Sequence, residues 1–161
     1  MYNHAPPGYD CPFCQIIKKA EKIQQSTQLS DVIYYSKAAT AFLALHCWPK
    51  NPVNVLVIPN EHFENLYDLP LEYANPLHQL TRAIALSLKR VYHCDGISTR
   101  QHNEPAGSQD VWHYHVHITP RYTEDGFYKT QKVYSLESER LEHARHLREY
   151  VYTHQAELFT N

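Results

Sequence analysis

The pattern of apolar and polar positions divides the chain into short strands and two long helices. Apolar, aromatic and β-branched residues dominate 31–36 and 40–45, and the polar turn between them at Lys37 favours an antiparallel pair. Residues 53–59 are almost all apolar and predict a central strand. Pro59 should end that strand, because proline lacks the amide hydrogen that a central ladder requires.

The longest helix is predicted over 71–93, where apolar residues recur at steps of three and four and can cover one face of a sheet. Pro76 lies in its early part and leaves its first residue open. A short helical turn is predicted from Pro12 to Lys18, followed by a polar stretch that ends at Ser30. The apolar stripe of the long helix consists of Leu77, Leu80, Ile84, Leu88 and Val91.

A second helical pattern begins at Leu136, after a turn at 124–126, with Ser135 or Ser138 available as its cap. The elements together predict an α+β domain that is built on an antiparallel sheet. The apolar positions of this last helix are Leu141, Ala144, Leu147, Val151 and Leu158.

Histidine occupies every second position near the start of the last predicted strand, 113–121. Residues 96–102 predict the strand before it, and 103–108 form the connecting loop. Alternate side chains of a strand face the same side, so three imidazoles should share one surface. Such a surface can be a metal sink or a polar sheet face, but crowded imidazoles lose basicity, and a nucleophile or metal ligand must be neutral. The three are His113, His115 and His117.

Composition limits the classes of partner. The 161 residues fit one domain, and 15 Lys and Arg against 17 Asp and Glu give a net charge of −2. This balance gives no electrostatic reason to expect a nucleic acid or an anionic membrane as the main partner. No apolar stretch approaches the roughly 20 residues that span a bilayer, and the first residues lack an export signal, so we expect a soluble, cytoplasmic protein.

Two of the four cysteines form a Cys-x-x-Cys pair, Cys11 and Cys14. Without an export signal, disulfides are not expected, and the pair suggests a metal site or redox chemistry. Cys47 and Cys94 match no ligand spacing and are expected to be core or loop residues.

Residues 109–121, with three alternating histidines followed by two residues and Pro-Arg, resemble the signature of the histidine triad (HIT) family of nucleotide hydrolases and transferases. The resemblance extends through 10–14 and 53–62, as in bacterial members that carry a Cys-x-x-Cys zinc motif. It implies a HIT-like fold, with about five antiparallel strands, a long helix packed on them and an extra C-terminal helix.

The same resemblance implies a division of the chain and an assembly. A HIT domain would cover 10–122, after an N-terminal tail at 1–9 and before a C-terminal extension with a helix at 123–161. The family's sheets commonly join in pairs, which predicts a homodimer.

The resemblance also implies the chemistry. His115 occupies the position of the nucleophile, which attacks phosphorus and forms a covalent nucleotidyl-histidine. His117 would bind the phosphate, while Gln109 and loop amides would stabilise charge on the phosphate and leaving group. The expected ligand is a purine nucleotide or conjugate: a nucleoside phosphoramidate, a dinucleoside polyphosphate or a related nucleotidyl substrate.

Several positions depart from the family pattern. Ser108 stands where glycine is usual, so either the loop holds one extra residue or Ser108 offers its own amide and hydroxyl. His46 stands near the place of an acidic residue that binds ribose hydroxyls, and Asn103 near an Asn or Gln that contacts phosphate or ribose. Asn54 replaces a histidine of relatives, which should alter bonding behind the triad but not remove activity.

Resemblance supplies two further ligands for the cysteine pair. His62, which follows the Ile-Pro-x-x motif, and His113 would join Cys11 and Cys14 in a closed tetrahedral Zn²⁺ site of structural type. The alternative is a pair of ordinary buried cysteines.

Two other functions compete with nucleotidyl transfer. One is a nucleotide- or zinc-binding interaction protein with negligible catalysis, although such a binder does not require a nucleophile at His115. The other is an oxygen-using metal enzyme, which would need an open redox-metal site, whereas a Cys2His2 set closes the coordination sphere.

Overall fold

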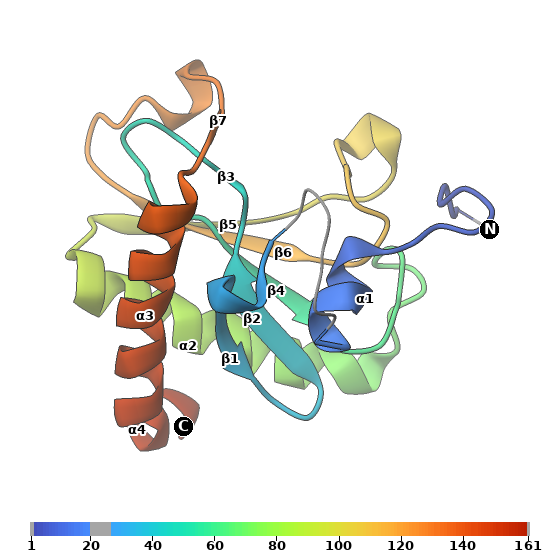
Figure 1. Cartoon of the computed structure of the whole chain (residues 1–161), viewed down its shortest axis with the longest axis horizontal. Coiled ribbons are helices and arrows are strands. Elements are labelled where there is room, and N and C mark those ends of the chain that lie inside the picture. Colours follow the sequence, from blue (N-terminus) through green and yellow to red (C-terminus); the bar gives the residue numbers. More distant parts are fainter. Residues whose placement is uncertain (1, 20–26, 161) are drawn as a thin grey trace.

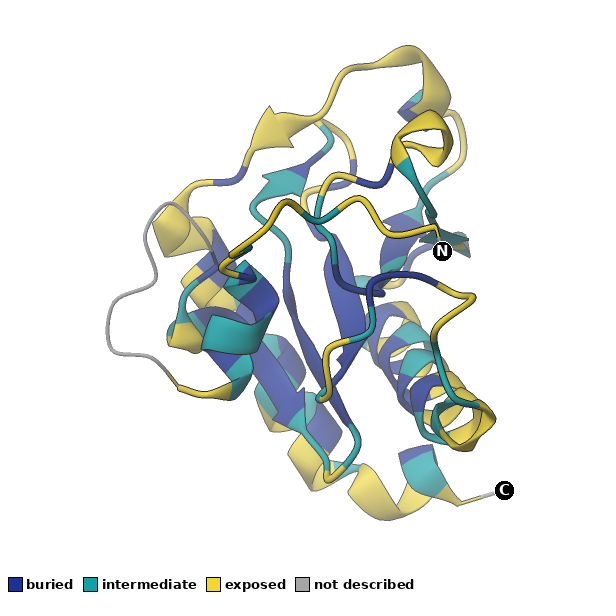
Figure 2. Cartoon of the chain, turned by 90° about the vertical axis from the view of Figure 1, so that its right-hand side faces the viewer, coloured by how far each residue is buried: buried dark blue, intermediate teal, exposed yellow. Residues whose placement is uncertain are grey.

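The computed structural model describes residues 2–19 and 27–160, and its centre is a five-stranded antiparallel sheet (Figure 1). The strand order is β1-β2-β4-β6-β5, which places β4 in the middle as its apolar sequence predicts. Every residue of β2 and β4 is buried, and Figure 2 shows buried strands at the centre of the molecule in dark blue. The strands are β1 Val32–Tyr35, β2 Ala39–Leu43, β4 Val55–Pro59, β5 Gly96–Gln101 and β6 Val116–Arg121.

Helix α2 (Ala74–Tyr92) covers one face of the sheet, after a 3-10 turn η2 (Leu71–Tyr73). The predicted stripe is confirmed, because Leu77, Leu80, Ile84 and Leu88 are buried and Val91 packs against the same core. Pro76 is tolerated since it lies in the first turn, where amide hydrogens have no acceptor within the helix.

Helix α1 (Pro12–Ile17) lies on the opposite face of the sheet from α2 (Figure 1). Its Phe13 and Ile16 are buried against Phe42 and Leu56. The chain thus forms three layers, and the side chains of the α1 face are the ones that reach the histidine cluster.

Helices α3 (Glu137–Thr153) and α4 (Gln155–Phe159) pack beside β1 and α2. Of the apolar positions with helical spacing, Ala144, Leu147 and Val151 are buried, but Leu141 is 50% exposed. Its neighbour Arg140 is buried instead, because its guanidinium binds the carboxylate of Asp31 at 3.1 Å. Neither candidate serine caps the helix: the N-cap is Leu136, without a side-chain hydrogen bond.

The segment after β6 forms a second, two-stranded sheet that the sequence did not predict. Strand β3 (His46–Cys47) pairs with β7 (Val133–Tyr134), which follows the 3-10 turn η4 (Phe127–Lys129). The rings of Trp48 and Phe127 lie 4.1 Å apart between centroids. The C-terminal extension therefore folds back along the loop that follows β2.

The histidine run is only partly a strand, since β6 begins at Val116. Before it, the amide of His113 donates to the carbonyl of Val111, and the amide of Tyr114 donates to that of Phe63. These bonds divert the chain from the β4 ladder. The three imidazoles nevertheless lie next to one another, because Phe13 contacts the rings of both His113 and His115, and the ring of His115 lies 4.9 Å from that of His117.

The N-terminal segment is docked on the domain. Amides of His4 and Ala5 donate to the carboxylate of Glu64, and Nε2 of His4 lies 3.2 Å from Glu104. Residues 20–26, in the predicted polar stretch, lie outside the described residues. The other 3-10 turns are η1 (Leu29–Asp31) and η3 (Pro105–Gly107).

Candidate functional site

A cavity of about 1050 Å³ opens on the α1 face of the sheet. Its size suits a ligand as large as a nucleotide. Its walls come from α1, β3, β5, β6, the loop before the triad and the C-terminal extension, and they include Phe13, His46, Arg100, Asp110, His115, His117 and Lys132.

His115 lies against this cavity with one nitrogen committed to the backbone. Its Nδ1 is 2.7 Å from the carbonyl oxygen of His113, which can only accept, so Nδ1 carries the hydrogen. The lone pair of Nε2 is therefore free. Burial lowers the pKa of His115, which keeps the ring neutral at pH 7. A neutral imidazole with a free Nε2 has the form of a nucleophile.

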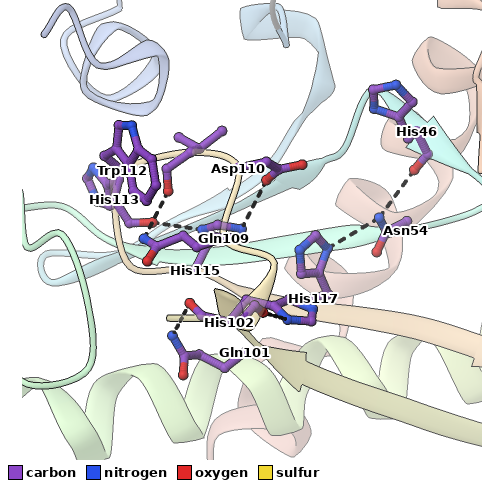
Figure 3. A network of polar contacts seen from close by, with 12 residues as sticks. His46, Asn54, Gln101, His102, Gln109, Asp110, Trp112, His113, His115 and His117 are labelled. Carbon is purple, nitrogen blue, oxygen red and sulfur yellow. Dashed lines mark hydrogen bonds and ion pairs between the residues drawn. The ribbon is translucent and has the colours of Figure 1, made fainter. Parts of the chain in front are cut away.

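His117 has the opposite hydrogen-bond arrangement (Figure 3). The side-chain amide of Asn54 donates to Nδ1 at 3.4 Å, which leaves the hydrogen on Nε2. Asn54 is itself held, since it also donates to the carbonyl of His46 and accepts from Thr119. His117 can thus donate a hydrogen bond to a ligand oxygen, whereas His115 can attack.

The electrostatics of His117 favour a neutral ring even more strongly. Burial lowers its pKa most, and the charges of His115, Arg100 and His102 lower it further. The ring centroids of His115 and His117 lie 4.9 Å apart, so both side chains can face one phosphate.

Gln109 does not line the cavity in this conformation. It is 5% exposed, its Nε2 donates to the carbonyls of Glu64 and Val111 at 2.6 and 3.0 Å, and its Oε1 accepts from the amide of Glu104 at 2.9 Å. These bonds fix the loop that leads to the triad. A direct contact with the leaving group stays a prediction, and the contacts present are those of a positioning residue.

Asn103 is likewise engaged within the protein. Its Oδ1 accepts from the amide of Leu66 at 2.8 Å, and it exchanges two hydrogen bonds with Gln101. Its predicted contact with phosphate or ribose stays a prediction.

Ser108 lines the cavity with its backbone in the left-handed region, at φ 70°. This conformation favours glycine, the residue that the family resemblance leads us to expect at this position. Its amide donates to the carbonyl of Pro105, so the amide is not available to a phosphate. Of the two groups that Ser108 itself was expected to offer, only the hydroxyl is compatible with these bonds.

Strand β3 and the extension shape the rest of the cavity. The ring of His46 lies 4.2 Å from that of Tyr134, and burial lowers the pKa of His46. Asp110 places Oδ1 4.0 Å from Nε2 of His115 and pairs through Oδ2 with Lys132 at 3.3 Å. An acidic group and a lysine thus lie beside Nε2 of His115.

The four predicted metal ligands lie together. One ligand atom each of Cys11, Cys14, His62 and His113 can be chosen so that all lie within 4.8 Å of one another. Three sulfur-to-Nδ1 distances are 3.3, 3.4 and 3.7 Å. A tetrahedral zinc site with Zn–S of about 2.3 Å and Zn–N of about 2.0 Å puts neighbouring ligand atoms roughly 3.5 Å apart. The donor set and spacing therefore fit a divalent metal such as zinc.

The orientation of His113 supports the same conclusion. Its Nε2 lies 3.0 Å from the carbonyl oxygen of Pro59, so Nε2 carries the hydrogen and Nδ1 faces the cysteines. The Cys11 thiol, followed by His113 and His62, holds the pKa of Cys14 well below its usual value, a state suited to a metal ligand.

Comparisons with known proteins agree with this architecture. The HIT domain family model matches residues 14–124, so the chain belongs to the HIT family. A protein named hit from Bacillus subtilis is 34% identical over 119 residues, 73% of this chain and 76% of that protein. The adenosine 5′-monophosphoramidase of Saccharomyces cerevisiae is 29% identical over 119 residues, 73% of this chain and 67% of that enzyme.

A solved structure has the same fold. The Hit-like protein involved in cell-cycle regulation from Bartonella henselae has a TM-score of 0.73 at 27% identity, covering 87% of this chain and 95% of that one. The predicted family and the predicted α+β fold are thus confirmed. No helix among the described residues is both long and apolar enough to cross a membrane.

Sequence reasoning missed three charged residues of the cavity. Arg100 and Lys132 lie in no motif, and Asp110 was included only as a position within the histidine motif. Arg100 could have been flagged by its position, since it precedes His102 by two residues and alternate strand residues share a face. Lys132 lies in the extension and gave no sequence signal.

Proposed function

We propose that this HIT protein is a nucleotide hydrolase or nucleotidyl transferase that works through a covalent nucleotidyl-histidine at His115. The observation that carries the proposal is the opposed hydrogen bonding of two neighbouring imidazoles. The His113 carbonyl leaves the Nε2 lone pair of His115 free, while Asn54 leaves the Nε2 hydrogen of His117 free. Transfer of a nucleotidyl group requires both an atom that attacks phosphorus and a hydrogen-bond donor to the phosphate oxygens.

The reaction would proceed in two displacements. The Nε2 lone pair of His115 forms a bond to phosphorus, and the leaving group departs with the electron pair of its own bond and takes up a proton. His117 donates to a phosphate oxygen as charge develops. Water or another acceptor then attacks phosphorus, loses a proton and breaks the P–N bond, which restores the neutral imidazole.

The substrate class is a purine nucleotide whose phosphate carries a leaving group: a phosphoramidate, a dinucleoside polyphosphate or a related conjugate. The yeast relative is a phosphoramidase, which supports the first of these. We propose that Ser108, Asn103, His46 and His117 contact the nucleotide and that Gln109 positions the loop around it. The HIT domain would comprise residues 10–122, with 1–9 as an N-terminal tail and 123–161 as a C-terminal extension.

We also propose that Cys11, Cys14, His62 and His113 hold Zn²⁺, which would supply a structural cross-link between α1, the segment after β4 and the residues before β6. Because His113 also orients His115, the same residues support the nucleophile. The protein would act in the cytoplasm as a homodimer, which light scattering on the purified chain can test.

The deciding experiment measures turnover of adenosine phosphoramidate, a diadenosine polyphosphate and a guanosine analogue. The parent should turn over at least one of them, and His115→Ala should abolish turnover while nucleotide binding persists. His78→Ala, an exposed histidine on α2, is the matched control and should keep full activity. Binding without turnover by the parent would favour the interaction-protein alternative.

A further inference from the structure

Arg100 is a charged residue of the cavity that the proposed mechanism does not use. In the register of β5 and β6, Arg100 is the cross-strand partner of His117 and lines the same cavity. Directly opposed residues of an antiparallel pair lie on one face of the sheet, with Cβ atoms about 5 Å apart. The Arg100 side chain therefore leaves the sheet next to His117, the proposed hydrogen-bond donor to a phosphate oxygen.

Aromatic side chains hold the guanidinium without neutralising it. Its central carbon lies 5.1 Å from the ring centroid of Trp48 and 4.7 Å from that of Phe127. Such cation–π contacts stabilise the guanidinium through its charge and neutralise none of it. Phe127 comes from η4, so the C-terminal extension helps to position Arg100.

The charge of Arg100 has no counterion in the part of the chain that the structure describes. Its Nε is buried without a hydrogen-bond partner, and no carboxylate lies within ion-pair distance. The Arg100 side chain is half-buried, and taking part of a charge out of water without a partner costs free energy that an anionic ligand would offset. By contrast, Arg121 on the next strand is paired with Asp125 at 2.7 Å.

The acidic groups of the cavity are occupied elsewhere. Asp110 pairs with Lys132, and Asp10 accepts a hydrogen bond from Gln15 beside α1. An anion that enters beside His117 would therefore meet Arg100 with its full charge. Guanidinium is well suited to phosphate, since its planar edge offers paired N–H donors.

We propose that Arg100 binds a second phosphate group of the nucleotide, distinct from the phosphate that His115 attacks. This inference rests on the proposed function and narrows its substrate class to nucleotides that carry two phosphate groups. The second phosphate belongs either to the leaving group or to the ribose. A cavity of about 1050 Å³ has room for either.

Calorimetry on the full chain tests this inference with three ligands: AMP, α,β-methylene ADP and adenosine 3′,5′-bisphosphate. The methylene bridge prevents cleavage between the two phosphates. One of the two ligands that carry a second phosphate should bind about tenfold more tightly than AMP, as expected for charge-assisted hydrogen bonds. Methylene ADP as the tighter ligand would place the second phosphate on the leaving-group side, and the 3′,5′-bisphosphate would place it on the ribose.

Arg100→Met keeps an unbranched apolar side chain beside the Trp48 and Phe127 rings and should reduce this tenfold advantage to less than about twofold, with AMP affinity nearly unchanged. Arg100→Lys should retain part of it, because the charge remains but the planar edge is lost. Arg90→Met removes an equal charge from the exposed side of α2 and should leave the advantage intact. Thermal melting verifies that each variant is folded.

The failures of the two proposals are distinguishable. The role of Arg100 is wrong, and the proposed function stands, if AMP binds but neither ligand with a second phosphate binds more tightly than AMP. The same conclusion follows if Arg100→Met still binds one of these ligands about tenfold more tightly than AMP. If no nucleotide binds and no substrate of the turnover panel is cleaved, both are wrong.

Discussion

The carbonyl oxygen of His113 accepts a hydrogen bond from Nδ1 of His115 at 2.7 Å. The ring of His113 faces Cys11 and Cys14, while its backbone orients the ring of His115. One residue thus connects the predicted metal ligands to the predicted nucleophile. A disturbance of the metal site should therefore reach the cavity through His113 and its backbone hydrogen bond to His115.

Loss of a metal ligand should lower both stability and activity. We expect the parent to contain one zinc per chain and Cys14→Ser to contain less than half of that. Its melting temperature should fall by roughly 10 °C, because a loss of a few kcal/mol shifts Tm by about 2–4 °C per kcal/mol in a chain of this size. Elemental analysis and thermal melting check both values.

Cys94→Ser is the matched control for that variant, since Cys94 is buried but lies outside the ligand group. It should keep its zinc. A parent that contains no zinc, or a Cys14→Ser protein that keeps a full equivalent, would contradict the metal assignment.

Asn54 should be required for the donor role of His117. In Asn54→Leu, Nδ1 of His117 loses its hydrogen bond, so the ring is free to place its hydrogen on either nitrogen. Steady-state kinetics should show kcat reduced about tenfold or more, with a smaller change in KM, since the lost contact matters most as charge develops.

Asn54→His restores the residue that relatives often carry and should recover most of the activity. If Asn54→Leu raised KM alone, Asn54 would be a ground-state binding residue. If both variants behaved like the parent, the proposed arrangement of the His117 hydrogens would be wrong.

The two buried imidazoles should make stability depend on pH. Burial holds the pKa of His115 and of His117 below the value of about 6.5 that histidine has in an unfolded chain. Below pH 6.5 the unfolded chain binds protons that the folded chain does not, so the free energy of unfolding falls as pH decreases. The loss should be about 1.4 kcal/mol per pH unit for each such ring.

Denaturant unfolding at pH 7.5, 6.0 and 5.0 measures how the free energy of unfolding depends on pH. His117→Asn should reduce this dependence by about 1.4 kcal/mol per pH unit, the contribution of one ring. Because His115 stays neutral below pH 6.5, the acid limb of kcat/KM should lie below that pH. An acid limb centred at or above pH 6.5 would show that His115 titrates normally.

Ser108 should carry backbone strain that glycine relieves. At φ 70° a serine is less favourable than glycine, so Ser108→Gly should raise the free energy of unfolding by about 1 kcal/mol. The reverse control is Gly126→Ala at φ 67°, where an added Cβ meets no atom closer than 4.0 Å, so only the backbone conformation opposes it. That variant should be destabilised by a similar amount.

Urea unfolding of both variants checks this pair of predictions. A stabilised Ser108→Gly protein whose activity falls would assign the Ser108 hydroxyl to the nucleotide site. An unchanged or lowered stability would contradict the strain.

The sequence by itself determined the elements whose cause is local. The stripe on α2 has helical period, and the apolar run of β4 has no polar position to expose, so both follow from neighbouring residues. The motif around His115 and the spacing of Cys11 and Cys14 were sufficient to assign the family. The grouping of those cysteines with His62 and His113 came from resemblance, and the geometry agrees with it.

Only the tertiary structure decided the features whose partners are distant in the chain. Arg140 is buried in place of Leu141 because Asp31, 109 positions away, accepts its hydrogen bond. Strand β7 forms because β3 offers an edge, and Gln109 turns inward because the carbonyl of Glu64 is there to accept. That Arg100 has no counterion among the described residues was also decided by the tertiary structure, because the fold of the whole chain determines which charges lie near it.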